Sequence, residues 1–153
     1  MPTYKLDFQT QINIPQQVVY EHLKDPQNFV GLQPLLTHVE SVKYEEQHGK
    51  QSVSYDTVEA FRWMGIVLYR NRIHVQTIFT NPPYEFETIV HSFPNITLNV
   101  KYLFTPQNGE TLIEETIQIQ THAWLAKFVL AQATQAQTTL LSNLKNRLEN
   151  KIN

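Results

Sequence analysis

The sequence has no cysteine, only 4 glycines and no long apolar run. Without cysteine the chain has no disulfide, no thiolate metal site and no cysteine nucleophile. The scattered glycines form neither a phosphate-binding loop nor the Gly-x-Ser-x-Gly turn that presents a nucleophilic serine. No segment approaches the roughly 18 apolar residues of a membrane-spanning helix, and Met1–Thr10 alternates polar and apolar residues, unlike a signal peptide. We therefore expect a cytoplasmic protein without a transmembrane segment.

The sequence also has no surplus of positive charge. It contains 12 Lys and Arg residues and 14 Asp and Glu residues, which give a formal net charge of -2. A chain without a basic field is not expected to hold a phosphate backbone, so we predict no nucleic-acid binding. No pair among the 6 histidines has metal-ligand spacing, so we predict neither a metal nor a cofactor. With 153 residues, 41% of them hydrophobic and 17% charged, the chain is expected to form one domain, residues 1–153. The composition makes no prediction of the oligomeric state.

Most of the chain has the pattern of β-strands. The segment from Tyr4 to Ile14 alternates apolar and polar residues, which is the period of a half-buried strand. Short turn sequences such as Asn108-Gly109 separate the later segments, and connections that short join antiparallel neighbours. Six further segments are rich in Val, Ile, Thr, Tyr and Phe: 39–46, 51–63, 66–80, 84–93, 96–105 and 111–120. The sequence therefore predicts an antiparallel sheet of about seven strands.

Helical patterns follow the first strand and the last one. Pro15 suits the first turn of a short helix that ends at Asp25-Pro26, and residues 28–34 predict a second short helix or a turn. From about Ala123 onward, apolar residues recur every four positions, which predicts one long amphipathic helix. A sheet with a single apolar face must cover that face, and only this helix has enough apolar surface. The expected fold class is α+β, with a curved antiparallel sheet wrapped around the C-terminal helix.

Five short segments stand at fixed places in this order of elements: Ile14-Pro15, Asp25-Pro26, Asn81-Pro82-Pro83, Phe104-Thr105-Pro106 followed by Asn108-Gly109, and the helix end at residues 144–149. With these segments, the order of elements resembles the START-like (SRPBCC) superfamily, and within it the polyketide cyclase/dehydrase and lipid-transport families. The resemblance implies the helix-grip fold and a cavity between the sheet and the last helix that holds lipids, sterols, polyketides or other aromatic molecules. It implies no catalytic residues, because the superfamily has no shared catalytic motif.

Three polar residues fall on strand faces that the alternation places inside. Odd positions are mostly apolar in segments 51–63, 66–80 and 111–120, and they include Glu59, Asn71 and Glu115. A buried carboxylate usually has a raised pKa, gains a partner or meets a ligand, so Glu59 and Glu115 are candidate catalytic acid/base residues. The alternative interpretation is that a β-bulge turns them outward, that they lie at the rim of the sheet, or that they pair with an arginine.

The long helix predicts a cavity. Its inner stripe is bulky at both ends and small or polar in the middle, at residues 131–136. Small residues that face the tyrosines of the sheet leave volume for a ligand, unless large side chains of the sheet fill it. The candidate ligand-binding residues combine this stripe with the inner strand faces: Tyr55, Glu59, Tyr69, Asn71, Val100, Tyr102, Glu115, Phe128, Gln132, Ala133 and Ala136.

Three hypotheses about function follow from these features. The first is a carrier or sensor that binds a small hydrophobic ligand, lipid-like or aromatic. The second is an enzyme of the polyketide cyclase or dehydratase type that uses Glu115 or Glu59 as its acid/base. The third is a protein-interaction module whose cavity is vestigial. Binding is the favoured hypothesis, because the sequence has cavity-compatible residues and no catalytic constellation.

Overall fold

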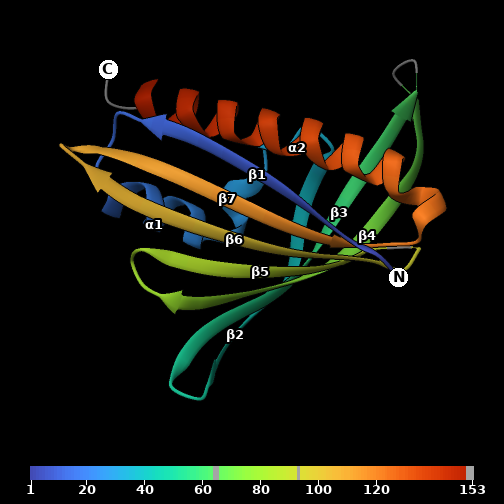
Figure 1. The fold of residues 1–153 in the computed structure, drawn as a ribbon, viewed down its shortest axis with the longest axis horizontal. Helices are drawn as coiled ribbons and strands as arrows, with labels where there is room; N and C mark the ends of the chain where they lie inside the picture. Colours follow the sequence, from blue (N-terminus) through green and yellow to red (C-terminus); the bar gives the residue numbers. More distant parts are fainter. Residues whose placement is uncertain (64–65, 93, 151–153) are drawn as a thin grey trace.

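A seven-stranded antiparallel sheet and a long helix make up most of the molecule (Figure 1). The computed structural model describes residues 1–63, 66–92 and 94–150, apart from the side chains of residues 47, 61–63 and 67–69. The strands lie in the order β1-β7-β6-β5-β4-β3-β2. The elements are β1 Thr3–Ile12, α1 Gln16–Lys24, the 3-10 helix η1 Pro26–Phe29, β2 Leu36–Gln47, β3 Lys50–Trp63, β4 Ile66–Asn81, β5 Glu85–Ser92, β6 Ile96–Gln107, β7 Glu110–Gln120 and α2 Ala123–Asn150. The predicted α+β class and helix-grip arrangement are confirmed.

Strands β2 to β7 pair with their neighbours in the chain, and β1 closes the order by pairing with β7. The β6–β7 turn illustrates how local sequence fixes this pairing. Asn108 and Gly109 have φ values of 53° and 83°. Positive φ at both central residues is the signature of a type I′ turn, whose twist matches that of the two strands, and Asn-Gly is the dipeptide that adopts it most readily. The turn therefore sets the uninterrupted register of β6 against β7.

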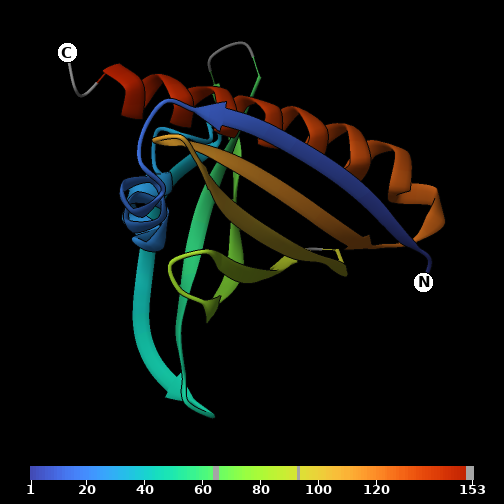
Figure 2. The same cartoon turned by 60° about the vertical axis from the view of Figure 1, so that its left-hand side comes forward.

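Helix α2 crosses the inner face of the curved sheet and runs beside β1, while α1 lies at one end of the sheet (Figures 1 and 2). Among the described residues, no helix is both long and apolar enough to cross a membrane. The sheet and α2 touch closely at the end near α1 and separate towards the start of α2. The molecule thus has a packed end and, as described below, a hollow end.

An aromatic cluster fills the packed end. Tyr20 of α1 is buried, and its ring makes edge contacts with Phe79, Phe86 and Phe104, at centroid distances of 6.5, 5.9 and 5.5 Å. Edge-to-face geometry at such distances is the favourable arrangement for aromatic pairs. Leu144 of α2 is also fully buried in this core. Together these contacts anchor α1 and the C-terminal half of α2 to the sheet.

The loop after η1 is held by the end of α2. The Arg147 guanidinium donates hydrogen bonds to the carbonyls of Asn28 and Val30, and the Asn143 amide donates to the carbonyl of Leu32. Gly31 has a φ of 89°, and a Cβ at this position would lie 2.8 Å from Arg147 Nη2. Residues 28–34, predicted to form a second short helix or a turn, are the end of a 3-10 helix followed by turns within this anchored loop, so the prediction is confirmed.

Candidate functional site

A cavity of about 480 Å³ lies between the inner face of the sheet and α2. Its volume falls within the roughly 300–1,000 Å³ of small-molecule sites. Nine of the predicted ligand-binding residues line it: Tyr55, Glu59, Asn71, Val100, Tyr102, Phe128, Gln132, Ala133 and Ala136. The side chain of Tyr69 lies outside the described residues, and Glu115 is not part of the lining. That these residues bind a ligand stays a prediction.

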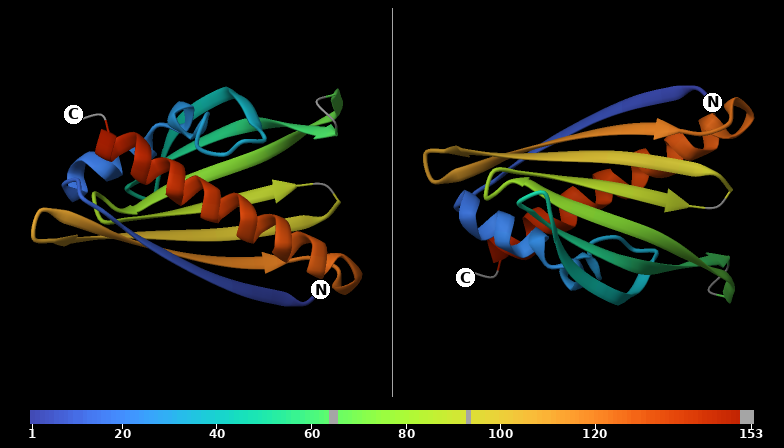
Figure 3. Two further views of the ribbon diagram at one scale, coloured as in Figure 1. Left: turned by 90° about the horizontal axis from the view of Figure 1, so that it is seen from above. Right: turned by 90° about the horizontal axis from the view of Figure 1, so that it is seen from below.

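The side chains of α2 account for the hollow end. Towards the packed end, Leu140 and Leu144 are buried against the sheet. In the middle of the helix, Ala133 and Ala136 face the cavity with a single methyl group each. Helix α2 keeps a straight course across the sheet (Figure 3), and the cavity lies between these short side chains and the residues of the facing strands. The small stripe therefore leaves space at Gln132, Ala133 and Ala136, as the sequence predicted. Ala131 and Gln135, also assigned to the stripe, are exposed and lie outside the lining.

A polar cluster, defined as Gln33, Glu59, Asn71 and Ser92, lies in the lining. Glu59 and Asn71 are direct cross-strand partners on β3 and β4, and the Asn71 amide donates a 3.4 Å hydrogen bond to the Ser92 hydroxyl. Burial raises the pKa of Glu59, and a hydrogen bond with Gln33 lowers it in part. The register shift between β3 and β4 falls between Phe61 and Arg62, beyond Glu59, and the shift opposite Glu59 lies on β2, between Leu36 and His38. Glu59 still lines the cavity, so neither irregularity turns it outward, and the cluster can present both donors and acceptors to a bound molecule.

Two tyrosines contribute hydroxyl groups elsewhere in the lining. Burial raises the pKa of Tyr55 to about 12, although a hydrogen bond with Thr77 opposes the shift. Burial, followed by the nearby Glu115 carboxyl, raises the pKa of Tyr102 well above its ordinary value. The Tyr102 hydroxyl donates a 3.5 Å hydrogen bond to Gln137 Oε1 of α2. Both tyrosines are therefore neutral hydrogen-bonding groups rather than bases.

Glu115 faces the same side of the sheet as the lining but lies in the core beside Tyr102, its cross-strand partner on β6. It is 1% exposed, and neither carboxyl oxygen has a hydrogen-bond partner of good geometry among the described residues. Burial raises its pKa to about 7, and the neighbouring Tyr102 hydroxyl offsets only part of this effect. β7 keeps its register with both neighbours, so no bulge turns Glu115 outward. Its carboxyl group is thus inward, as predicted, but one side chain removed from the cavity.

Sequence reasoning missed several polar residues of the lining. Thr57 occupies an odd position of β3, so the alternation that identified Glu59 also applies to it. Gln137 lies one residue after the small stripe of α2. Gln33 lies in the loop between η1 and β2, where no periodic pattern indicates which side chains point inward. Its position depends on contacts with the far end of the chain, which a local pattern does not contain.

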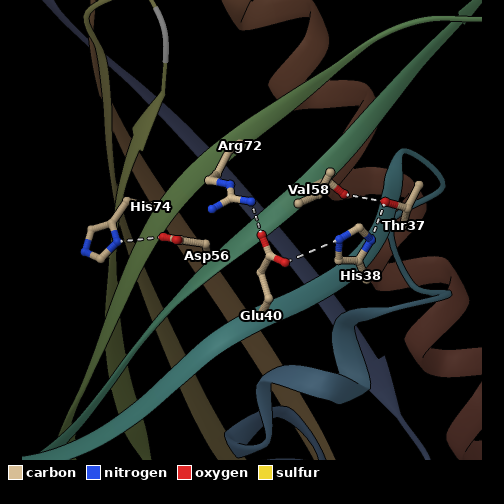
Figure 4. A network of polar contacts seen from close by, with 7 residues as sticks. All are labelled: Thr37, His38, Glu40, Asp56, Val58, Arg72 and His74. Atoms are coloured by element: carbon tan, nitrogen blue, oxygen red, sulfur yellow. Dashed lines mark hydrogen bonds and ion pairs between the residues drawn. The ribbon is translucent and has the colours of Figure 1, made fainter.

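The opposite face of the sheet carries a separate polar network (Figure 4). Arg72 Nη2 lies 2.5 Å from Glu40 Oε1, and His74 Nδ1 lies 3.0 Å from Asp56 Oδ1. His38 approaches the same Glu40 carboxylate at 3.7 Å. Exposed pairs of this kind typically contribute between about 0 and 1 kcal/mol to stability, and no group among the described residues has the arrangement of a metal site. The network therefore lies on a solvated strand face.

The sheet, the short helices after β1 and the long helix that encloses a cavity together define the START-like helix-grip fold. The sequence family described as "Domain of unknown function (DUF7053)" matches residues 9–150. The chain therefore belongs to this family. No curated protein matches the sequence.

Solved structures with the same fold include three that cover nearly the whole chain. The Zhui aromatase/cyclase from Streptomyces sp. R1128 is 14% identical, with a TM-score of 0.77 and coverage of 99% of this chain and 97% of that one. TTHA0849 from Thermus thermophilus is 17% identical (TM-score 0.74, 97% and 99% covered). A START superfamily protein from Mycobacterium smegmatis is 10% identical (TM-score 0.71, 95% and 97% covered). These similarities confirm the predicted START-like fold, and at such identities they show the fold alone.

Proposed function

We propose that the protein binds a small, uncharged, apolar molecule in the cavity, as a carrier or sensor. The observation that carries this proposal is the composition of the lining. It is mostly apolar, it holds one carboxyl group, that of Glu59, and it contains no Lys, Arg or His among the described residues. Apolar burial drives binding at roughly 25 cal/mol per Å², and the polar cluster supplies partners for a hydroxyl or amide group. A role in lipid transport and a cytoplasmic location stay predictions.

Native mass spectrometry of gently purified protein tests the proposal, followed by identification of whatever co-purifies. The expected result is a neutral lipid, isoprenoid or aromatic compound at near-equal stoichiometry, or uptake of one from a mixed panel. A clean mass of the unliganded chain with no uptake from such a panel would overturn the proposal. It would favour the third hypothesis, a protein-interaction module, which the volume of the cavity argues against.

Replacing Ala136 with leucine is expected to weaken ligand binding at least tenfold. Ala136 faces the cavity from α2, and a leucine side chain would occupy part of the space that a ligand needs. Displacement of a fluorescent apolar probe measures the effect. Ala131→Leu is the matched control, because Ala131 is exposed on the same helix and is not part of the lining. Equal affinities for the two variants would place the ligand outside this cavity.

A fatty alcohol is expected to bind at least tenfold more tightly than the fatty acid of the same chain length at pH 8. The two ligands differ only in the polar end, and a buried carboxylate without a cationic partner is costly. No described residue of the lining supplies that partner, and Glu59 adds a further carboxyl group. Acidification should narrow the difference, because the fatty acid then binds in its protonated form. Equal affinity at pH 8, measured by calorimetry, would contradict the uncharged ligand class.

The second candidate function is an enzyme of the cyclase or dehydratase type. The observation that favours it is Glu59, which lines the cavity and whose pKa burial raises towards the range of a general acid/base. Glu115 has no direct access to the cavity and would act only through Tyr102. Conversion of a bound polyketide to a product of different mass would favour the enzyme, whereas recovery of the compound unchanged would favour the carrier.

A further inference from the structure

Several large apolar side chains are exposed to solvent at the hollow end of the molecule. Trp124 and Phe128 of α2 are 77% and 60% exposed. They are four residues apart, so they lie on one face of the helix. Phe128 also lines the cavity, which makes the exposed aromatic surface continuous with the apolar interior. Ile66, at the start of β4, is a third large exposed apolar residue.

These residues come from segments that lie at the same end of the molecule. The start of α2, the end of β3 with the start of β4, and the end of β5 with the start of β6 all lie at that end in two perpendicular views (Figures 1 and 3). Pro94 and Ile96, from the β5–β6 connection, line the cavity there as well. The docking end is defined by six described residues and offers several spaced contacts to one broad surface: Ile66, Arg70, Pro94, Trp124, Lys127 and Phe128.

The charge of the docking end differs from that of the whole chain. The chain has a net charge of -2, yet residues 60–84 and 116–148 contain no Asp or Glu. Lys127 lies between Trp124 and Phe128 on α2 and is exposed, as is Arg70 on β4. Glu59 is the nearest acidic residue on β3, and it points into the cavity rather than outward. A surface that combines aromatic rings with isolated cations and lacks carboxylates complements the interfacial layer of a membrane with anionic lipids.

We propose that the docking end binds reversibly to the surface of an anionic lipid bilayer, with Trp124 and Phe128 in the interfacial layer and Lys127 and Arg70 near the lipid phosphates. Docking places the cavity mouth against the bilayer, so an apolar ligand passes between membrane and cavity without crossing water. The attachment is peripheral, since no helix among the described residues is able to span the bilayer. Two aromatic side chains and a few cations give weak, salt-sensitive binding rather than permanent anchoring.

Co-sedimentation of the full chain with vesicles tests this proposal. Vesicles of phosphatidylcholine alone are compared with vesicles that also contain phosphatidylserine, and no ligand is added. We expect binding to the anionic vesicles that weakens with salt, and a loss of at least tenfold in the double variant Trp124→Ser, Phe128→Ser. Lys127→Glu should weaken binding, whereas Lys50→Glu, at the β2–β3 turn, should not.

Tyr44→Ser is the matched control for the aromatic variants. Tyr44 is 62% exposed on β2, an exposure close to that of Phe128, but it lies away from the docking end. Equal loss of vesicle binding in Tyr44→Ser and in the double variant would overturn the proposal. The absence of wild-type binding to either type of vesicle would also overturn it. A concentration-dependent dimer that the double variant abolishes, without vesicle binding, would also overturn it and assign the surface to a second copy of the chain. Because the vesicle assay contains no ligand, its failure is distinct from failure to retain a molecule in the cavity.

Discussion

Replacing Phe86 with alanine is expected to lower the free energy of unfolding by about 3–5 kcal/mol. Phe86 lies on β5 at the centre of the aromatic cluster and is 1% exposed. Its ring centroid lies 5.0 Å from that of Tyr102, 5.5 Å from Phe104, 5.9 Å from Tyr20 and 6.1 Å from Phe79. Removal of the ring leaves a void between elements that are distant in sequence, and the surrounding rings relax only in part. Urea unfolding of the two proteins measures the loss.

Tyr84→Ala is the matched control for this prediction. Tyr84 is an aromatic residue two positions earlier in the chain, but its side chain is 44% exposed. Its truncation is expected to change stability by no more than about 1 kcal/mol. If Phe86→Ala lost no more than Tyr84→Ala, the aromatic cluster would not be the source of stability of the packed end. Another set of contacts would then have to hold α1 and α2 against the sheet.

The division into a packed and a hollow end explains how the fold tolerates a cavity. Protein interiors are normally filled, and large voids lower stability. Here the cluster around Phe86 and the buried leucines of α2 stabilise one end, while the other end keeps Ala133 and Ala136 against open space. The hydrophobic side chains that would close the cavity are absent from the middle of the helix. The cavity and the packed core therefore depend on different halves of the same helix.

Local sequence patterns predicted the sheet well, because the side chains that cause the patterns also form the structure. The alternation in β7 places Ile113, Ile117 and Ile119 on one face, and all three are fully buried. The Asn108-Gly109 turn was equally readable, since its backbone conformation follows from its two residues. Apolar residues recur every four positions along α2, and the structure has one continuous helix over this segment, Ala123–Asn150. Each of these features depends on neighbours in the chain.

Features that depend on distant residues could not be predicted in this way. Gln33 is held in the cavity lining by a loop whose carbonyls accept hydrogen bonds from Arg147 and Asn143, more than 100 residues later in the chain. The alternation likewise gave Glu59 and Glu115 the same inward orientation but not their depth. Glu59 lines the cavity, whereas Glu115 is buried beside Tyr102 and is not part of the lining. Depth depends on what covers each strand, and that is a property of the assembled fold.

Replacing Glu115 with glutamine is expected to stabilise the protein more at pH 8 than at pH 5, by about 2–3 kcal/mol. Burial raises the pKa of Glu115 from its ordinary value of 4.5 to about 7. Between these values the folded chain keeps the proton and the unfolded chain releases it, so the folded state binds more protons. Stability from this group is therefore complete below pH 4.5 and is lost as the pH rises towards 7. Glutamine stays neutral throughout, so the variant avoids this loss.

Urea unfolding at the two pH values, applied to Glu115→Gln, Glu114→Gln and the wild type, separates this effect from the titration of other groups. Glu114 is the adjacent residue and is exposed on the opposite face of β7, so its replacement is expected to change stability by about 0.5 kcal/mol or less at either pH. Parallel stabilities of the wild type and Glu115→Gln across this range would contradict a buried carboxyl without a partner. The predicted divergence would instead establish that a neutral carboxyl group lies behind Tyr102. Glu115 is not part of the cavity lining, so its protonation is expected to change the stability of the fold rather than the choice of ligand.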